Sequence, residues 1–132
     1  MNNKKSGNQF EAELCEILSK HGFWCHNLAQ NSAGQPADVI AVKNGNAYLI
    51  DCKVCSNGKF SLNRIEENQS LSMELWRECG NSTGWFALKF GDNIYMVPLA
   101  TLQAIRNIRT TITEMFAAKG CYKLDDWVAM RR

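Results

Sequence analysis

Residues 35–53, which read QPADVIAVKNGNAYLIDCK, decide the fold because they predict a β-hairpin with charged residues at one end. Apolar runs flank the dipeptide Asn44-Gly45, which favours a type I′ turn, a turn whose two central residues both take positive φ. A two-residue turn at this point also sets the register of the strands. In that register Asp38 lies directly opposite Asp51, whereas a slip of one residue would put the two acids on opposite faces.

Asp38, Asp51 and Lys53 are therefore predicted to converge. Side chains alternate along a strand, so Lys53 shares the face of Asp51 while Cys52 points the other way. Facing carboxylates repel one another unless a cation neutralises them, and carboxylates with water and substrate phosphate suit a magnesium-like ion. A lysine beside them can orient or deprotonate a water, or stabilise charge on a phosphate. The alternative is a surface hairpin whose acids form ordinary ion pairs, but the apolar strands disfavour it.

The length and charge of the chain set its class. Its 132 residues are enough for one domain with a proper core, and 15 Lys and Arg against 13 Asp and Glu leave a net charge of +2. This balance neither requires nor excludes a nucleic-acid partner. No apolar run approaches the length of a membrane span, and the first residues lack the apolar segment of a signal peptide. We expect an intracellular protein that acts in the cytoplasm.

The six cysteines are scattered and do not predict disulfides. Four lie in apolar contexts, where a free cysteine behaves as a small hydrophobic residue: Cys15, Cys25, Cys79 and Cys121. Cys52 and Cys55 have the spacing of a metal or redox pair, with His21, Cys25 and His26 as conceivable partners. A second pair at matched spacing is missing, so a zinc or redox function is the least favoured hypothesis.

The residues before the hairpin predict a helix and a strand. The helix begins near Ser6, where a capping box with Gln9 fits, and ends at Gly22. Glu11 lies at the margin of its apolar stripe. A short strand over residues 23–28 and a polar loop follow.

Beyond the hairpin, the sequence predicts a helix over residues 66–79 with Leu71 and Leu75 in its buried face. A second hairpin covers residues 85–97. The next helix, over residues 99–108, would direct three apolar side chains inward: Leu102, Ile105 and Ile108.

Residues 110–132 are the least readable segment, and we expect them to pack outside the sheet or against another subunit. Each tryptophan falls within an apolar pattern, which favours the core or a subunit interface over base stacking. The chain is expected to form a single domain, with a flexible arm over residues 1–6.

The order of these elements, with Pro36-Ala37-Asp38 followed by Asp51-Cys52-Lys53, resembles the PD-(D/E)xK nuclease superfamily. Within it, the chain resembles the RecU-like Holliday-junction resolvases of low-GC bacteria and their phages. The likeness runs over about residues 7–102 and includes Glu11-Ala12-Glu13-Leu14, an opening that is similar in archaeal and RecU-type resolvases. Further similar segments cover residues 34–38, 49–54, 62–69 and 95–99. The resemblance implies an α/β (α+β) restriction-endonuclease-like core, with a central mixed sheet of about four to five strands flanked by helices.

The resemblance also implies a site and a reaction. Asp38, Asp51 and the backbone carbonyl of Cys52 would bind Mg²⁺, for which Mn²⁺ would substitute, and Glu11 would bind metal directly or through water. Lys53 would position and activate the attacking water. The implied reaction is hydrolysis of DNA phosphodiesters, with paired nicks in a four-way junction by a homodimer. Candidate DNA contacts are Lys4, Lys5, Ser32, Gln35, Lys59, Arg64 and Gln69, and such contacts would make binding salt-dependent.

Two departures from the family pattern bear on the substrate. Asp51 replaces the more common glutamate of the E-x-K motif, and the chain has no long basic insertion like the stalk of larger RecU proteins. The alternatives are a VRR-NUC-type or restriction-like nuclease that acts on flaps or duplex DNA, and a catalytically silent DNA-binding module. The intact set of acids and lysine argues against the silent module.

Overall fold

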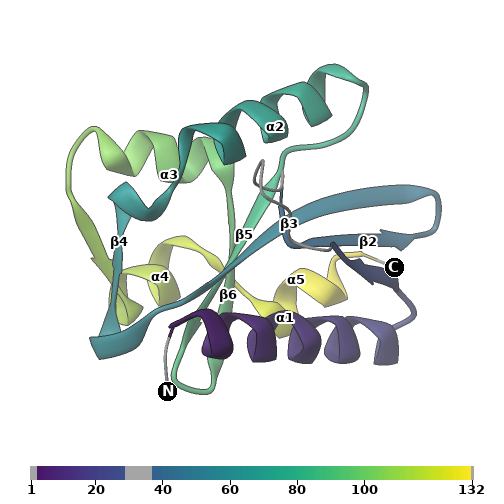
Figure 1. Cartoon of the computed structure of the whole chain (residues 1–132), viewed down its shortest axis with the longest axis horizontal. Helices are drawn as coiled ribbons and strands as arrows, with labels where there is room; N and C mark the ends of the chain where they lie inside the picture. Colours follow the sequence, from purple (N-terminus) through teal and green to yellow (C-terminus); the bar gives the residue numbers. More distant parts are fainter. Residues whose placement is uncertain (1–2, 29–36, 132) are drawn as a thin grey trace.

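A six-stranded mixed sheet forms the centre of the computed structural model, which describes residues 3–28 and 37–131, with side chains from Gly7 onward (Figure 1). Its order is β1-β2-β3-β5-β6-β8, and only the β3–β5 pair is parallel. The strands are β1 (Trp24–Asn27), β2 (Val39–Lys43), β3 (Asn46–Val54), β5 (Trp85–Phe90), β6 (Asn93–Pro98) and β8 (Tyr122–Lys123). The predicted mixed sheet flanked by helices is confirmed, with six strands in place of four to five.

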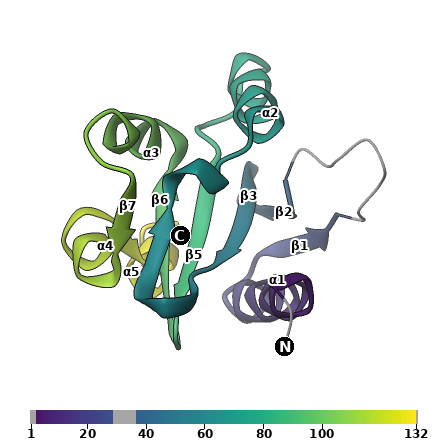
Figure 2. The ribbon, with the colours of Figure 1, turned by 60° about the vertical axis from the view of Figure 1, so that its left-hand side comes forward.

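Helices cover both faces of this sheet. On one face lie α1 (Asn3–Lys20) and α5 (Leu124–Ala129), and on the other lie α2 (Glu67–Glu78), α3 (Leu99–Arg106) and α4 (Glu114–Gly120). A second sheet pairs β4 (Lys59–Ser61) with β7 (Thr111–Thr113), and Figure 2 shows β7 leading from α3 to α4 beside β4. Two short 3₁₀ turns, η1 (Ser56–Gly58) and η2 (Leu62–Arg64), flank β4. None of the described helices is long and apolar enough to cross a membrane.

The predicted hairpin is confirmed, including its register. The ladder runs from Val39 opposite Ile50 to Lys43 opposite Asn46, and the turn residues Asn44 and Gly45 have φ of 52° and 79°. The main sheet has one hydrophobic core on each face, and side chains of β3 alternate between them. Leu49 packs with residues of α2 and α3, whereas Ile50 packs with residues of α1. The hairpin therefore fixes which face each charged residue takes.

The start of α1 and the buried face of α2 differ from the predictions. Helix α1 begins at Asn3 instead of near Ser6, so residues 3–6, expected in a flexible arm, are helical. Leu71 and Leu75 are 56% and 61% exposed, because α2 instead buries Gln69 and Met73 against the sheet. Met73 lies so close to Gly84 that a Cβ atom there would collide with it, which fixes the rotation of the helix.

Two further residues are more exposed than predicted. Ile108 is 80% exposed because α3 ends at Arg106, before the inward stripe reaches it. Trp24 is 63% exposed and stacks on His26, which is also exposed, so it lies outside the core. The C-terminal segment adds β8 to the sheet edge and buries Trp127 completely against the α1 face.

Candidate active site

Asp38 lies one residue before β2, at the point where the hairpin ladder ends. Its N–H donates a 3.0 Å hydrogen bond to the carbonyl of Ile50, and its Oδ2 accepts one of 2.7 Å from the N–H of Cys52. These two contacts hold the carboxylate of Asp38 against the strand that carries Asp51. Asp38 is 7% exposed and Asp51 is 1% exposed, so the two predicted partners meet in a buried environment.

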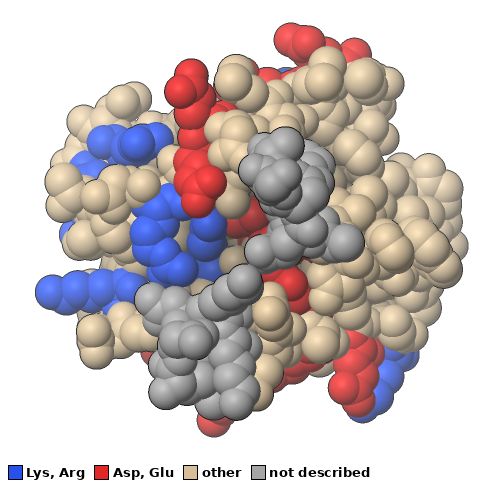
Figure 3. Space-filling model, in the orientation of Figure 1, with Lys and Arg blue, Asp and Glu red and all other residues tan. Residues whose placement is uncertain are grey.

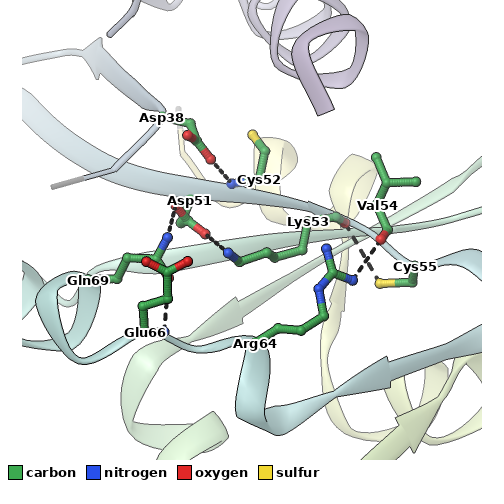
Figure 4. Close-up of polar contacts among 9 residues, drawn as sticks. All are labelled: Asp38, Asp51, Cys52, Lys53, Val54, Cys55, Arg64, Glu66 and Gln69. Atoms are coloured by element: carbon green, nitrogen blue, oxygen red, sulfur yellow. Dashed lines mark hydrogen bonds and ion pairs between the residues drawn. The ribbon is translucent and has the colours of Figure 1, made fainter. Parts of the chain in front are cut away.

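Both oxygens of Asp51 have a defined neighbour (Figure 4). Oδ1 accepts a 3.0 Å hydrogen bond from Nε2 of Gln69 on α2, and Oδ2 lies 3.2 Å from Nζ of Lys53 on its own strand. Asp51 and Lys53 share one face of β3, as their spacing predicts.

Gln69 is oriented by the start of α2. Its Oε1 accepts a 3.2 Å hydrogen bond from the backbone N–H of Glu66, so its amide nitrogen points to Asp51. Gln69, which the family resemblance implies as a DNA contact near the site, is 8% exposed and donates its hydrogen bond to Asp51. Glu66 and Gln69 have the Glu-x-x-Gln spacing of a capping box at a helix start, and this sequence signal predicts the orientation of Gln69.

Glu11 joins the acids from α1. Burial, a hydrogen bond with Asp38 and the negative charges of Asp38 and Asp51 raise the pKa of Glu11 to about 8. Burial and the charge of Asp38 likewise raise the pKa of Asp51 to about 8, although the ammonium of Lys53 opposes this shift. Three carboxyl groups thus share a buried site whose one adjacent cation, among the described residues, is Lys53.

The donor set fits a hard divalent cation. Mutual repulsion favours the protonated form of buried carboxyl groups. A cation that binds between them removes this repulsion and stabilises the charged form. In the ranges that the structure describes, no three His, Cys, Asp or Glu side chains are already arranged around an ion position. The fit is thus to an ion that completes its shell with water and substrate oxygens, as Mg²⁺ does.

The two central cysteines are buried within the protein. Burial raises the pKa of the Cys52 thiol well above its usual value, and burial raises the pKa of Cys55 to about 12. Cys52 packs with residues of α1 and Cys55 packs with residues of α2 and α3, so the two thiols lie on opposite sides of the main sheet. His21 and His26 are both exposed, and the described residues contain no metal cluster that includes either cysteine. The geometry favours packing for Cys52 and Cys55.

The remaining candidate DNA contacts differ in their placement. Lys59 is exposed, whereas Arg64 is half-buried and donates a 2.8 Å hydrogen bond from Nη1 to the carbonyl of Val54. Ser32, Gln35 and the side chains of Lys4 and Lys5 lie outside the described residues. Figure 3 shows Lys and Arg side chains gathered next to acidic ones, on the part of the surface near β4.

Comparison with known proteins identifies the family of the chain. The crossover junction endodeoxyribonuclease Hjc of Methanocaldococcus jannaschii is 27% identical over 95 residues, which cover 71% of this chain and 67% of that protein. The solved structure of Hjc from Archaeoglobus fulgidus, a Holliday junction resolvase from an archaeal hyperthermophile, superimposes with a TM-score of 0.70 at 19% identity. That match covers 94% of this chain and 96% of the other, and it shows the shared fold. The family model described as archaeal Holliday junction resolvase (hjc) matches residues 2–132, so the chain belongs to this family of PD-(D/E)xK-type nucleases.

Proposed function

We propose that the chain is a metal-dependent DNA endonuclease that resolves four-way junctions by paired nicks. The observation that carries the proposal is the buried Asp51, which lies between Gln69 and Lys53 and faces the carboxylate of Asp38. Membership of the resolvase family supports the same reaction. Burying several acids beside one lysine is costly for a protein without chemistry to perform, which disfavours a silent DNA-binding module.

Asp38, Asp51 and the backbone carbonyl of Cys52 would hold Mg²⁺, for which Mn²⁺ would substitute, and Glu11 would bind it directly or through water. The bound ion would polarise the phosphoryl oxygen, lower the pKa of the attacking water and neutralise the leaving oxygen. Asp38 is suited to this role because the Cys52 N–H fixes one of its oxygens at 2.7 Å.

Lys53 has the position of the residue that prepares the water. Its side chain is 12% exposed and its ammonium lies 3.2 Å from Asp51, so it is held at the rim of the acidic cluster instead of in bulk solvent. From there the ammonium can orient a water through one N–H and stabilise negative charge on the phosphate through another. Gln69 keeps the carboxylate of Asp51 in a single orientation while this happens.

Two copies of the chain would act together in the cytoplasm. A twofold-symmetric dimer presents one site to each of two opposed strands of a junction. Exposed apolar side chains such as Leu71 and Leu75 are the kind of surface that a second chain covers, and a light-scattering mass of two chains tests the dimer. We also propose that the chain is of the RecU-like type found in low-GC bacteria and their phages, a proposal supported by the similarity of residues 34–38 and 49–54 to those resolvases.

Cleavage of a panel of labelled DNAs tests the proposed function. Four-way junction, flap, duplex and single-stranded DNA are each incubated with the protein in Mg²⁺, in Mn²⁺ and in chelator. Paired symmetric nicks in the junction alone, dependent on metal, are expected. Cutting of flaps or duplex instead would indicate a VRR-NUC-type or restriction-like nuclease, and DNA binding without cutting in either metal would contradict the enzyme.

A further inference from the structure

A basic pocket lies beside β3, directly beyond Lys53. It has a volume of about 370 Å³, and its lining includes Lys59, Arg64 and the hydroxyl-bearing residues Ser56, Ser61 and Thr111. These residues come from η1, from the strand pair β4–β7 and from η2. Of these segments, η1, β4 and η2 follow one another over residues 56–64, and the pairing of β4 with β7 adds Thr111 from a distant part of the sequence.

The pocket lies on the catalytic side of the main sheet. Phe60 of β4 and Ile112 of β7 face each other and are completely buried in the core that also contains Cys55. Cys55 lies two residues after Lys53 and points to the same side of the sheet. This core and the side chains of Asp51 and Lys53 therefore lie on one face of β3. The neighbours Ser61 and Thr111, which are also paired, therefore point away from the core and line the pocket.

Arg64 is held in place, and among the described residues one of its donors forms a hydrogen bond. Nη1 donates to the carbonyl of Val54 at 2.8 Å, and the guanidinium lies 5.6 Å from the centre of the Phe60 ring. A guanidinium carries five N–H donors in one rigid plane, so this anchor leaves a preorganised fork for an anion. The backbone of Val54 follows Lys53 directly, which ties the position of Arg64 to the catalytic strand.

A neighbouring pocket shows why an anion would prefer this one. That pocket, of about 470 Å³, lies on the other side of η1, where the ammonium of Lys89 contacts both carboxylate oxygens of Glu13 at 2.9 and 3.0 Å. Its positive charge is therefore already neutralised. Over the described residues, neither Lys59 nor Arg64 forms an ion pair with an acid. The positive charge of the basic pocket is available to a ligand.

We propose that the basic pocket binds a backbone phosphate of the cleaved DNA strand, next to the phosphodiester that is cut. This inference rests on the proposed function and deepens it, because it assigns a positioning subsite beyond the catalytic residues. Lys59 and Arg64 supply the charge, and the hydroxyl of Thr111 supplies a neutral hydrogen bond. Held at two phosphates, the strand would present the scissile bond to Asp51 and Lys53 in one orientation.

The test combines single substitutions in the pocket with neutralised phosphates in the DNA. Binding to a fluorescent four-way junction is followed by anisotropy in chelator, across a salt series, for wild type, Lys59→Gln, Thr111→Val and Arg64→Lys. Lys20→Gln is the matched control. Lys20 is an exposed lysine at the C-terminal end of α1, where it pairs with Glu16, and it does not line the basic pocket. Single methylphosphonates then replace each phosphate around the cut in turn. Melting temperatures check that each variant is folded.

Wild type is expected to lose affinity at one or two methylphosphonate positions that flank the cut. Lys59→Gln is expected to lower the slope of log binding constant against log salt by about one, and to be insensitive to the same methylphosphonates. Lys20→Gln should keep the wild-type slope. Wild-type affinity and slope in all three pocket variants would overturn the inference while leaving the nuclease intact. If wild type prefers flap or duplex DNA, the series is run on that DNA; failure to bind any DNA would overturn both proposals.

Discussion

Gln69 donates a 3.0 Å hydrogen bond to Asp51 across the interface between α2 and β3, and the N–H of Glu66 fixes the direction of that bond. Removing the donor with Gln69→Leu leaves Oδ1 of Asp51 buried without this partner. We expect metal affinity or cleavage to fall by about 10- to 100-fold, the usual cost of losing a residue that orients a ligand. Metal titration of cleavage measures both quantities.

Glu67→Ala is the control for this prediction. It removes an exposed side chain in the first turn of α2 but keeps Glu66, whose backbone N–H binds Gln69. The variant should therefore cut DNA at close to the wild-type rate. Equal activity of Gln69→Leu and wild type would show that Asp51 needs no orientation from α2.

The buried acids should make the metal-free protein less stable as the pH rises. The pKa of Asp51 is about 8 when folded and about 4 when unfolded, so the folded state holds more protons between these values. Since stability falls with pH wherever the folded state binds more protons, the melting temperature in chelator should fall from pH 5 to pH 8. Asp51→Asn should flatten this dependence and raise the melting temperature at pH 8. If the melting temperature of Asp51→Asn fell with pH as steeply as that of wild type, Asp51 would not be the group with the raised pKa.

Mg²⁺ should reverse this loss. An ion that binds only the folded state stabilises it by about 2.7 kcal/mol at 100 times its Kd. The gain in melting temperature should be larger at pH 8 than at pH 6, because the carboxyl groups must lose their protons to bind metal. Asp51→Asn should show little gain. Calorimetry with and without Mg²⁺ measures the effect, and an equal gain in this variant would place the ion elsewhere.

Lys53→Gln should separate metal binding from catalysis. The substitution removes the ammonium beside Asp51 but none of the proposed metal ligands. Cleavage is expected to fall by a factor on the order of 100 or more, since a positioned acid-base group contributes about that much. Stabilisation by Mg²⁺ should persist. A variant that cuts at the wild-type rate would remove Lys53 from the mechanism.

Two isoleucines near the end of α3 provide a matched test of the fold. Ile105 is 7% exposed and Ile108 is 80% exposed, although helical spacing predicts both to be buried. Ile105→Ala should lower the free energy of unfolding by about 2–5 kcal/mol, because it opens a cavity in the core. Ile108→Ala should change it by less than about 0.5 kcal/mol. Chemical denaturation measures both, and similar losses would mean that the helix continues past Arg106.

Local signals in the sequence were enough to predict the hairpin and the face that carries Asp51 and Lys53. The Asn44-Gly45 turn and strict alternation determine the positions of Asp51 and Lys53, since both effects act within a few residues. The rotation of α2 was not predictable in the same way. In the sequence, Leu71 and Leu75 form as good a buried stripe as Gln69 and Met73 do. The contacts of Met73 with Gly84 and of Gln69 with Asp51 determine which face of α2 is buried.

Pairings over long sequence distances were also beyond the reach of local patterns. Strands β4 and β7 have three residues each, too few for a periodic signal, and they become strands only by pairing with one another. The pairing adds Thr111 to the basic pocket, so the sequence identified Lys59 and Arg64 as basic candidates but could not place a residue of β7 beside them. Family resemblance, and not periodicity, implied that Glu11 belongs to the site, and the structure adds its hydrogen bond with Asp38.

Cleavage of a four-way junction by wild type, Asp38→Asn and Asp51→Asn, in Mg²⁺ and in chelator, tests the central claim most directly. Strands labelled at each arm report where and how often the junction is nicked. Two symmetric nicks by the wild type in Mg²⁺, with none in chelator and none by either variant, are the predicted result. Undiminished nicking by Asp51→Asn, or by the wild type in chelator, would contradict an active site built on these two carboxylates.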